Sequence, residues 1–342
     1  MELVGGDAPA GAESGPAELS LAVGDRGHPV DDLQHRLHEA GFVTTPDPAG
    51  RFGSGTRAAV EAFQHRRGLR VDGVCGPETW AALVEAGYRL GERRLLYLRQ
   101  PMLRGDDVAE LQQRLSALGF DTGRVDGIFG EHTAAALAEF QRNVGLPVDG
   151  ILGVETLHEL QRVTPRHAEP ELVSAVRDRE LLRQAPRTLA NRRIAVGEPG
   201  GLDALVHAVR RRLAAAGAQV VPVLHPTGSM QAAAANTAEV EVYLGLRLDP
   251  HCNRCSAAYY SGYSYESPGG RRLAAIVDAL AAAALGVPSE GPQGMALPVL
   301  RETRMTAVIC EVGDAPRVVQ HIAELAESLV GALIAWAATP VD

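Results

Sequence analysis

Apolar residues recur every three or four positions through most of the first half of the chain. Residues 106–118 show the pattern clearly, because their apolar side chains fall on one face of a helix: Val108, Leu111, Leu115 and Leu118. Gly119 follows and ends the predicted helix, since glycine is typical just beyond a helix C-terminus. A second helix with the same period is predicted from Thr133 to Val144.

These helical blocks, and the turns between them, are duplicated. The sequence VDGIFG at 125–130 returns as VDGILG at 148–153, 23 residues later. The block at 25–88 keeps the same internal interval. Its offset from the second block is 77 residues from Gly53 onward, as from Phe63 to Phe140, and 78 residues upstream, as from Leu33 to Leu111, which indicates a one-residue indel in a loop. Each block predicts three short helices, and the Asp-Gly turns use glycine where the backbone must turn sharply.

The connector between the two blocks, RLGERRLLYLRQPML, carries apolar residues that a flexible linker would not need: Leu95, Leu96, Tyr97 and Leu98. We therefore expect the two blocks to pack as one rigid unit.

From Arg192 onward the pattern changes to alternating strands and helices. Such alternation is typical of an α/β domain with a largely parallel sheet. The predicted fold is α+β and multidomain: two three-helix modules precede an α/β domain with a mostly parallel, twisted sheet. The expected boundaries are a disordered lead-in at 1–24, modules at 25–90 and 102–163, a linker at 164–190 and the α/β domain at 191–342.

Composition narrows the class of partner. The formal net charge of −9 argues against nucleic acid or an anionic membrane surface, because both need a basic face. The first 20 residues have neither basic nor long apolar runs, and no later apolar run is long enough to span a bilayer. Four cysteines do not make a disulfide scaffold, so we expect a cytoplasmic protein.

The order of motifs in each block resembles the peptidoglycan-binding type 1 module. Leu-Gln, Phe-Gln and the Asp-Gly boxes recur in the same order over residues 25–88 and 102–162. The resemblance implies a shallow groove that binds glycan or stem peptide, with Asp72, Asp126 and Asp149 as candidate ligand-binding residues. The same boxes are also explained by turn geometry alone, or by modules that now dock proteins.

The α/β half resembles the zinc-dependent N-acetylmuramoyl-L-alanine amidases (amidase type 3). The resemblance implies three metal ligands and a catalytic glutamate in a V-E-x-G box, and Glu311 in CEVG occupies that position. The ligand positions depart from the family. The first box, IAVGEPGG, has no histidine and leaves Glu198 as the only acid nearby, and Arg247 stands where the third ligand, a histidine, belongs.

A guanidinium keeps its proton in proteins and repels a dication, so we expect no bound metal and no amide hydrolysis. Arg247, Glu198 and Glu311 are predicted to converge at the ends of neighbouring strands, where an arginine–carboxylate pair fills the volume of the zinc ion.

Several residues keep more than one interpretation. Cys252 and Cys255, preceded by His251, have the spacing of half a zinc site. They are equally interpreted as an exposed dithiol or as loop residues without a chemical role. Tyr259 and Tyr263 either line a groove or lie on a half-buried strand. Cys75 corresponds to Leu152 of the second block, so we expect it to be a small apolar residue of the core.

The sequence combines two binding modules with an amidase-like domain that lacks the metal ligands, and it shows no secretion signal. This combination closely resembles the actinobacterial CwlM group. The shared sequence motifs include DGVCGPETW from residue 72 and the L-R-x-T-R-M pattern at 300–305. The resemblance implies a cytoplasmic pseudoenzyme that regulates peptidoglycan precursor synthesis. Its implied partners are the enolpyruvyl transferase MurA, a PASTA-type Ser/Thr kinase and the lipid II flippase.

Three functions remain open from the sequence. The first is a non-catalytic regulator that needs no cofactor. The second is a working zinc amidase with a rearranged metal site. The third is a plain binding protein for muropeptides or lipid-linked precursors.

Overall fold

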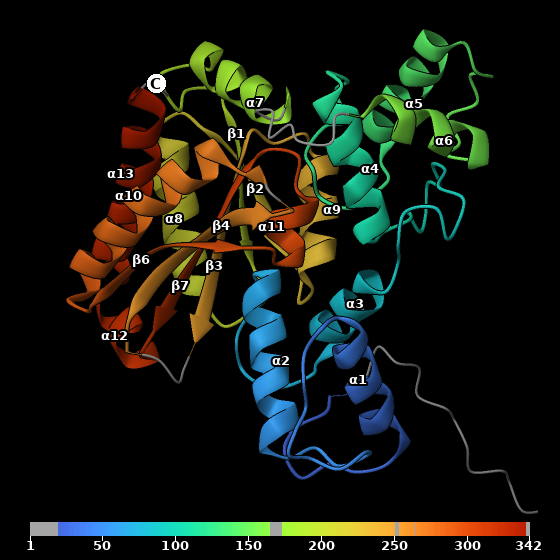
Figure 1. The fold of residues 1–342 in the computed structure, drawn as a ribbon. Helices are drawn as coiled ribbons and strands as arrows, with labels where there is room; N and C mark the ends of the chain where they lie inside the picture. Colours follow the sequence, from blue (N-terminus) through green and yellow to red (C-terminus); the bar gives the residue numbers. More distant parts are fainter. Residues whose placement is uncertain (1–19, 165–172, 250–252, 264, 340–342) are drawn as a thin grey trace, which may run out of the picture. The chain divides into compact units, whose positions relative to one another are not determined.

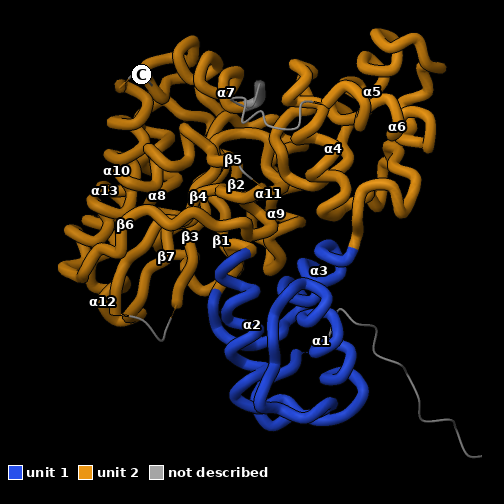
Figure 2. The backbone as a smooth tube through the Cα atoms, in the orientation of Figure 1, with its two compact units in different colours: residues 1–66, 71–87 blue, residues 67–70, 88–342 orange. Residues whose placement is uncertain are grey.

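The computed structural model describes residues 20–164, 173–249, 253–263 and 265–339 (Figure 1). Its contacts divide the chain into two compact units (Figure 2). The first contains residues 1–66 and 71–87, and the second contains residues 67–70 and 88–342. The second module therefore shares its unit with the α/β domain rather than with the first module. We expected the two modules to pack as one rigid unit, but the contacts group them into different units.

The first module consists of three helices, as predicted: α1 (His28–Glu39), α2 (Ser54–Arg67) and α3 (Pro77–Ala86). Its core is built from aliphatic residues and two phenylalanines, among them Leu33, Val60 and Phe63. Cys75 is fully buried, and burial raises the pKa of its thiol to about 12. It is a core residue, in agreement with the sequence.

The second module repeats this arrangement with α4 (Asp106–Ala117), α5 (Glu131–Val144) and α6 (Val154–Val163). The predicted apolar face is buried at Val108, Leu111 and Leu115, next to Leu137 and Phe140. The connector belongs to this core as well. Leu95 is fully buried and forms a β-bridge with Leu152, and Tyr97 packs against the same core, whereas Leu98 is 39% exposed.

A helix, α7 (Val173–Gln184), leads into the α/β domain. The strands of that domain are β1 (Arg193–Glu198), β2 (Gln219–Leu224), β3 (Val242–Asp249), β4 (Cys255–Gly262), β5 (Tyr265–Glu266), β6 (Ser289–Met295) and β7 (Thr306–Gly313). The helices are α8 (Asp203–Ala215), α9 (Gly228–Thr237), α10 (Pro268–Leu285), α11 (Pro298–Glu302), α12 (Ala315–Gln320) and α13 (Ile322–Ala338). The order of the strands is β2-β1-β3-β7-β4-β5, and β6 pairs with β4.

The sheet is mixed rather than purely parallel. The pairs β1–β2, β1–β3 and β3–β7 are parallel, whereas β4 runs antiparallel to β7. A connection of only five residues follows β3, which is too short for a crossover, so β4 returns in the opposite direction on the far side of β7. β6 has no apolar run and is largely exposed, which explains why the sequence did not indicate it.

Alternating residues of the strands feed two cores, one on each face of the sheet. One face is covered by α8, α10 and α13, and the other by α9 and α11 (Figure 1). Val196 and Leu244 point to the first face, and Ala195 and Tyr243 to the second. The second core also contains Val125 of the second module. None of the described helices is both long and apolar enough to cross a membrane.

Candidate functional site

Two of the three predicted site residues meet at the carboxyl-terminal ends of adjacent parallel strands. Arg247 on β3 and Glu311 on β7 are register partners, so their side chains leave the same face of the sheet. The Nε atom of Arg247 lies 3.6 Å from Oε1 of Glu311. The side chains of Arg247 and Glu311 are 41% and 21% exposed, so this ion pair is partly open to water.

A second guanidinium reaches the same carboxylate. Arg70, in the short segment 67–70 that belongs to this unit, donates from Nη2 to Oε1 of Glu311 at 2.5 Å. One carboxylate therefore faces two cations, and the cluster carries a net charge of +1. The sequence did not single out Arg70, because nothing local marks a residue whose partner is 241 positions away.

Glu198 does not join this cluster, and the predicted convergence of all three residues is wrong on this point. Gly197 is the register partner of Gly245, which lies on the same face as Arg247. Glu198 is one residue further and so points to the opposite face. It is buried there, and its Oε2 accepts a hydrogen bond from the backbone N–H of Leu202 at 2.9 Å, beside the start of α8. Burial raises the pKa of its carboxyl.

These residues do not fit a zinc ion. A catalytic zinc site needs three neutral or anionic ligands around an open position. Here the corresponding edge offers two guanidinium groups and one carboxylate that both of them already engage. Glu198 faces away. Within the described ranges, no group of three or more histidine, cysteine, aspartate or glutamate side chains has a metal-binding arrangement.

The second hypothesis for zinc rested on Cys252 and Cys255. His251 and Cys252 lie outside the described residues. Cys255 is buried in β4, with its Sγ 4.0 Å from Sγ of Cys310 on β7. Both belong to the core under α10, and the hydrogen bond to Cys255 together with burial raises the pKa of the Cys310 thiol. Two thiols buried in an apolar core are poor metal ligands.

The Asp-Gly boxes of the modules are held by buried glutamines from the Leu-Gln and Phe-Gln motifs. Nε2 of Gln141 donates to Oδ1 of Asp149, to the Ile151 carbonyl and to Oγ1 of Thr156. Its Oε1 accepts from the backbone N–H groups of Asp149 and Gly150. A single side chain therefore closes the whole turn.

The same arrangement occurs at the other boxes. Gln64 binds Asp72, and Gln112 binds Asp126, in both cases with a threonine hydroxyl as a further acceptor. Each aspartate also accepts from the N–H two residues ahead: Val74, Ile128 and Ile151. The carboxylates of Asp72, Asp126 and Asp149 are thus engaged in shaping their own turns. This arrangement favours the turn-geometry interpretation of these residues.

The two tyrosines proposed for a groove lie in different places. Tyr259 is buried, its hydroxyl bonds to Glu266, and burial raises its pKa to about 12. It faces the core that α10 covers. Tyr263 lies against the second module, and its hydroxyl donates to Oδ1 of Asp106 at 3.1 Å. The two side chains do not line one surface.

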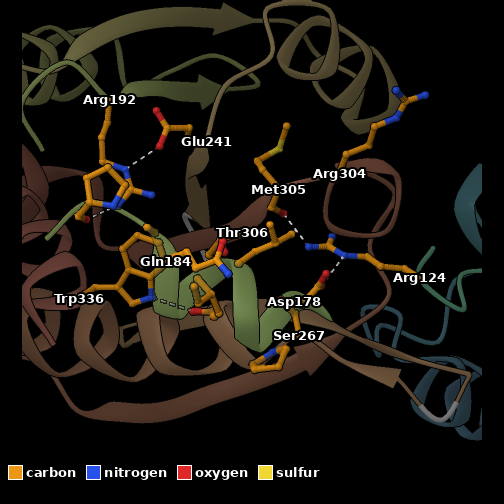
Figure 3. A pocket seen from close by; sticks show the side chains of 16 residues that line it. Arg124, Asp178, Gln184, Arg192, Glu241, Ser267, Arg304, Met305, Thr306 and Trp336 are labelled. Atoms are coloured by element: carbon orange, nitrogen blue, oxygen red, sulfur yellow. Dashed lines mark hydrogen bonds and ion pairs between the residues drawn. The ribbon is translucent and has the colours of Figure 1, made fainter. Parts of the chain in front are cut away.

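A cavity of about 380 Å³ lies at the other end of the strands (Figure 3). Arg192, directly before β1, and Thr306, the first residue of β7, line it together with residues of α7. Trp336 forms part of its wall and donates from its indole N–H to the Gly269 carbonyl at 3.1 Å. This cavity is remote from the Arg247–Glu311 pair, because the two occupy opposite ends of the same strands.

Comparison with known proteins agrees with this architecture. The family model of the peptidoglycan binding domain, PG_binding_1, matches residues 26–83 and 104–160. The N-acetylmuramoyl-L-alanine amidase CwlM of Mycobacterium tuberculosis is 34% identical over 333 residues, which cover 86% of this chain and 82% of that protein. The chain belongs to the CwlM family. The resemblance seen in the sequence is confirmed.

Other relatives of this CwlM family member match smaller parts. The amidase CwlL of Bacillus licheniformis is 34% identical over 161 residues, 41% of this chain and 45% of that protein. A spore cortex-lytic enzyme of Bacillus cereus is 53% identical over 60 residues, 18% of this chain and 23% of that protein. The crystal structure of the amidase Ami1 from Mycobacterium smegmatis aligns with 44% of this chain and 98% of its own, at 12% identity and a TM-score of 0.38.

Proposed function

We propose that this CwlM family member is a non-catalytic, amidase-like regulator of peptidoglycan precursor biosynthesis. The observation that carries the proposal is the contact of Arg247 and Arg70 with Glu311. Glu311 occupies the position of the family's catalytic carboxylate. Its Oε1 accepts a hydrogen bond from Arg70 and forms an ion pair with Arg247, where a proton-transferring residue would need a metal-bound water.

The chemistry of amide hydrolysis explains why this contact matters. Zinc lowers the pKa of its bound water to about 7, and a nearby carboxylate then moves the proton. Arg247 neither binds nor tolerates a dication, and Glu198 is turned to the other face of the sheet. The residues present therefore support binding through the surface of the domain and not turnover at its strand ends.

We further propose that regulation works through protein partners in the cytoplasm. The candidates are a MurA-type enolpyruvyl transferase, a PASTA-type Ser/Thr kinase and the lipid II flippase, which the resemblance to the CwlM group suggests. Peptidoglycan fragments remain candidate ligands of the modules, since both modules match a peptidoglycan binding domain.

The alternative is a zinc-dependent N-acetylmuramoyl-L-alanine amidase with a rearranged metal site. Two observations favour it: Glu311 is retained, and the full-length relative bears the name of an amidase.

One experiment separates the two functions. Purified full-length protein is incubated with muropeptide and zinc, and release of the stem peptide is measured beside the turnover of a MurA-type transferase. A regulator gives no peptide release and changes the transferase rate. Peptide release that chelation and Glu311→Ala both abolish, with no effect on the transferase, would establish the amidase instead. Glu327→Ala, on an exposed helix surface, serves as the matched control.

A further inference from the structure

The two Asp-Gly loops of the second module have nearly the same sequence but different surroundings. The first contains Val125, Asp126 and Gly127, and the second contains Val148 and Asp149 at the equivalent places. Val125 is fully buried, whereas Val148 is 49% exposed. Since the glutamine bonds inside the two loops are equivalent, this difference arises from contacts outside the module.

The backbone of the first loop is bound by side chains of the α/β domain. Nε of Arg301 donates to the Asp126 carbonyl at 2.6 Å. The hydroxyl of Tyr260 donates to the Val125 carbonyl at 3.2 Å. Arg301 opens the R-E-T-R-M part of the motif at 300–305, and Tyr260 lies on β4.

Arg124 makes the reciprocal contacts from the loop to the domain. Its Nη1 donates to the Thr303 carbonyl at 2.8 Å, and its Nη2 donates to the Met305 carbonyl at 3.0 Å. The Arg124 side chain is only 10% exposed and also pairs with Asp178 on α7 at 3.4 Å. Backbone carbonyls that accept from a buried guanidinium form strong, charge-assisted hydrogen bonds.

An ion pair and a further hydrogen bond flank these bonds. Nη1 of Arg104 lies 2.7 Å from Oε1 of Glu302, and Nε2 of Gln113 donates to the Tyr263 carbonyl at 3.0 Å. The contact thus extends from the loop along α4 and is not a single point.

One residue distinguishes the two loops in the sequence. Arg124 precedes Val-Asp-Gly in the first loop, and Pro147 precedes it in the second. Proline has neither a side-chain donor nor a backbone N–H, so it cannot bind the two carbonyls of the 300–305 motif. The equivalent position of the second loop is exposed.

We propose that the first Asp-Gly loop of the second module is an internal docking site for residues 300–305. Of the two Asp-Gly loops of this module, the second, residues 147–151, is therefore the one open to an external ligand or partner. The inference does not depend on the proposed function, because it concerns which face of the module is available and not what the protein regulates.

Amide hydrogen exchange on the full chain tests the docking without any ligand. The N–H groups of Gly127 and Ile128 make the same local bonds as those of Gly150 and Ile151. Docking predicts that the first pair exchanges more than about ten-fold more slowly than the second. Equal rates in the two loops would overturn the proposal.

Substitution of the docking residues supplies the second readout. Arg124→Ala combined with Arg301→Ala should accelerate exchange in the first loop and leave the second loop unchanged, whereas Arg114→Ala on the outer face of α4 should alter neither. If the double variant accelerates amide exchange in both loops, the module itself has opened. Single alanine substitutions of the loop glycines then test whether the first loop is docked.

A Cβ atom at Gly127 meets the Gly105 carbonyl oxygen of the same module at 3.0 Å, Nη2 of Arg301 at 3.1 Å and the Tyr263 ring at 3.2 Å, whereas at Gly150 the nearest atom is 3.7 Å away. Both glycines have a φ near +70°, so the backbone strain of an alanine is matched: 71° and 68°. Gly127→Ala should accelerate exchange at Ile128 more than Gly150→Ala does at Ile151, and this excess should shrink when Arg301→Ala is added, because Arg301 then no longer meets the new methyl group. An excess that Arg301→Ala leaves unchanged would contradict docking.

The last arm adds N-acetylmuramoyl-L-alanyl-D-isoglutamine to the wild-type chain. Protection of residues 125–128 by this muropeptide would overturn the proposal. Protection confined to 147–151, or no protection at all, agrees with the proposal. A result without any protection would count against muropeptide binding by the module and not against the docking of the first loop.

Discussion

Arg247 on β3 and Glu311 on β7 are register partners in neighbouring parallel strands, and their side chains meet with Nε 3.6 Å from Oε1. Arg70 binds the same carboxylate. An edge of the sheet at which the amidase family holds a cation thus carries two cations of its own. The pair of Arg247 and Glu311 is the arginine–carboxylate contact expected from the sequence, and Arg70 is the member of the cluster that the sequence did not indicate.

Glu311→Ala should lower thermal stability, because it leaves Arg70 and Arg247 facing each other without their shared counter-ion. The pair is partly exposed, so we expect a loss of about 1 kcal/mol. For a unit of this size that corresponds to a fall of about 2–4 °C in the melting temperature. Differential scanning calorimetry of wild type, Glu311→Ala and the control Glu327→Ala checks it. If the melting temperature falls equally in both variants, Glu311 does not stabilise the fold through this contact.

Arg247→His alone should not create a zinc site. The substitution restores one family ligand, but Glu198 remains bound to the Leu202 N–H on the opposite face of the sheet. Elemental analysis after dialysis against zinc should give less than one zinc per chain at this position in both wild type and variant. Stoichiometric zinc that depends on His at 247 and on Glu311 would mean that the strand ends still assemble a metal centre.

Gln141→Ala should destabilise the second module strongly. The substitution removes the donor to Asp149, Ile151 and Thr156 and leaves buried polar groups without a partner. We expect a loss of about 2–3 kcal/mol in the unfolding free energy. Urea unfolding followed by amide exchange within α5 and α6 measures it. Gln184→Ala, which removes an exposed bond to Glu180, is the control and should change little.

Asp126 and Asp149 should respond to pH in opposite directions. Burial raises the pKa of Asp126, so its folded state holds the proton more tightly than the unfolded state does. Its ionised carboxylate therefore costs stability at neutral pH, and the cost disappears as pH falls through the folded pKa towards the unfolded value of about 3.9. Asp126→Asn should raise the melting temperature at pH 7, and this gain should shrink on acidification.

Hydrogen bonds from the Ile151 N–H and from Gln141 lower the pKa of Asp149. Its contribution to stability is complete above the unfolded value and is lost as pH falls through the folded pKa. Asp149→Asn should therefore lower the melting temperature at pH 7 and have less effect in strong acid. Melting curves of both variants across about pH 3 to 7 check the sign. Parallel pH profiles for the two variants would contradict the assigned environments.

Much of the architecture follows from local pattern. The helical faces at Val108, Leu111 and Leu115, the turn glycines and the duplication are properties of neighbouring residues, and the structure confirms them. The match of Glu311 to a catalytic box and of Arg247 to a ligand position was also visible locally. Strand β6 and helices α9 and α11 were not indicated, because they are short or lack a clear apolar period.

What the sequence determined by itself is therefore the kind of most elements, the repeat that makes two modules, and an arginine at position 247, where the resemblance to the amidases places a histidine. Only the tertiary structure decided which residues meet. It turned Glu198 to the other face of the sheet, brought Arg70 to Glu311, and docked one Asp-Gly loop while it left its twin exposed. Local sequence cannot specify such contacts, because partners separated by 175 to 241 positions are selected by the packing of whole elements.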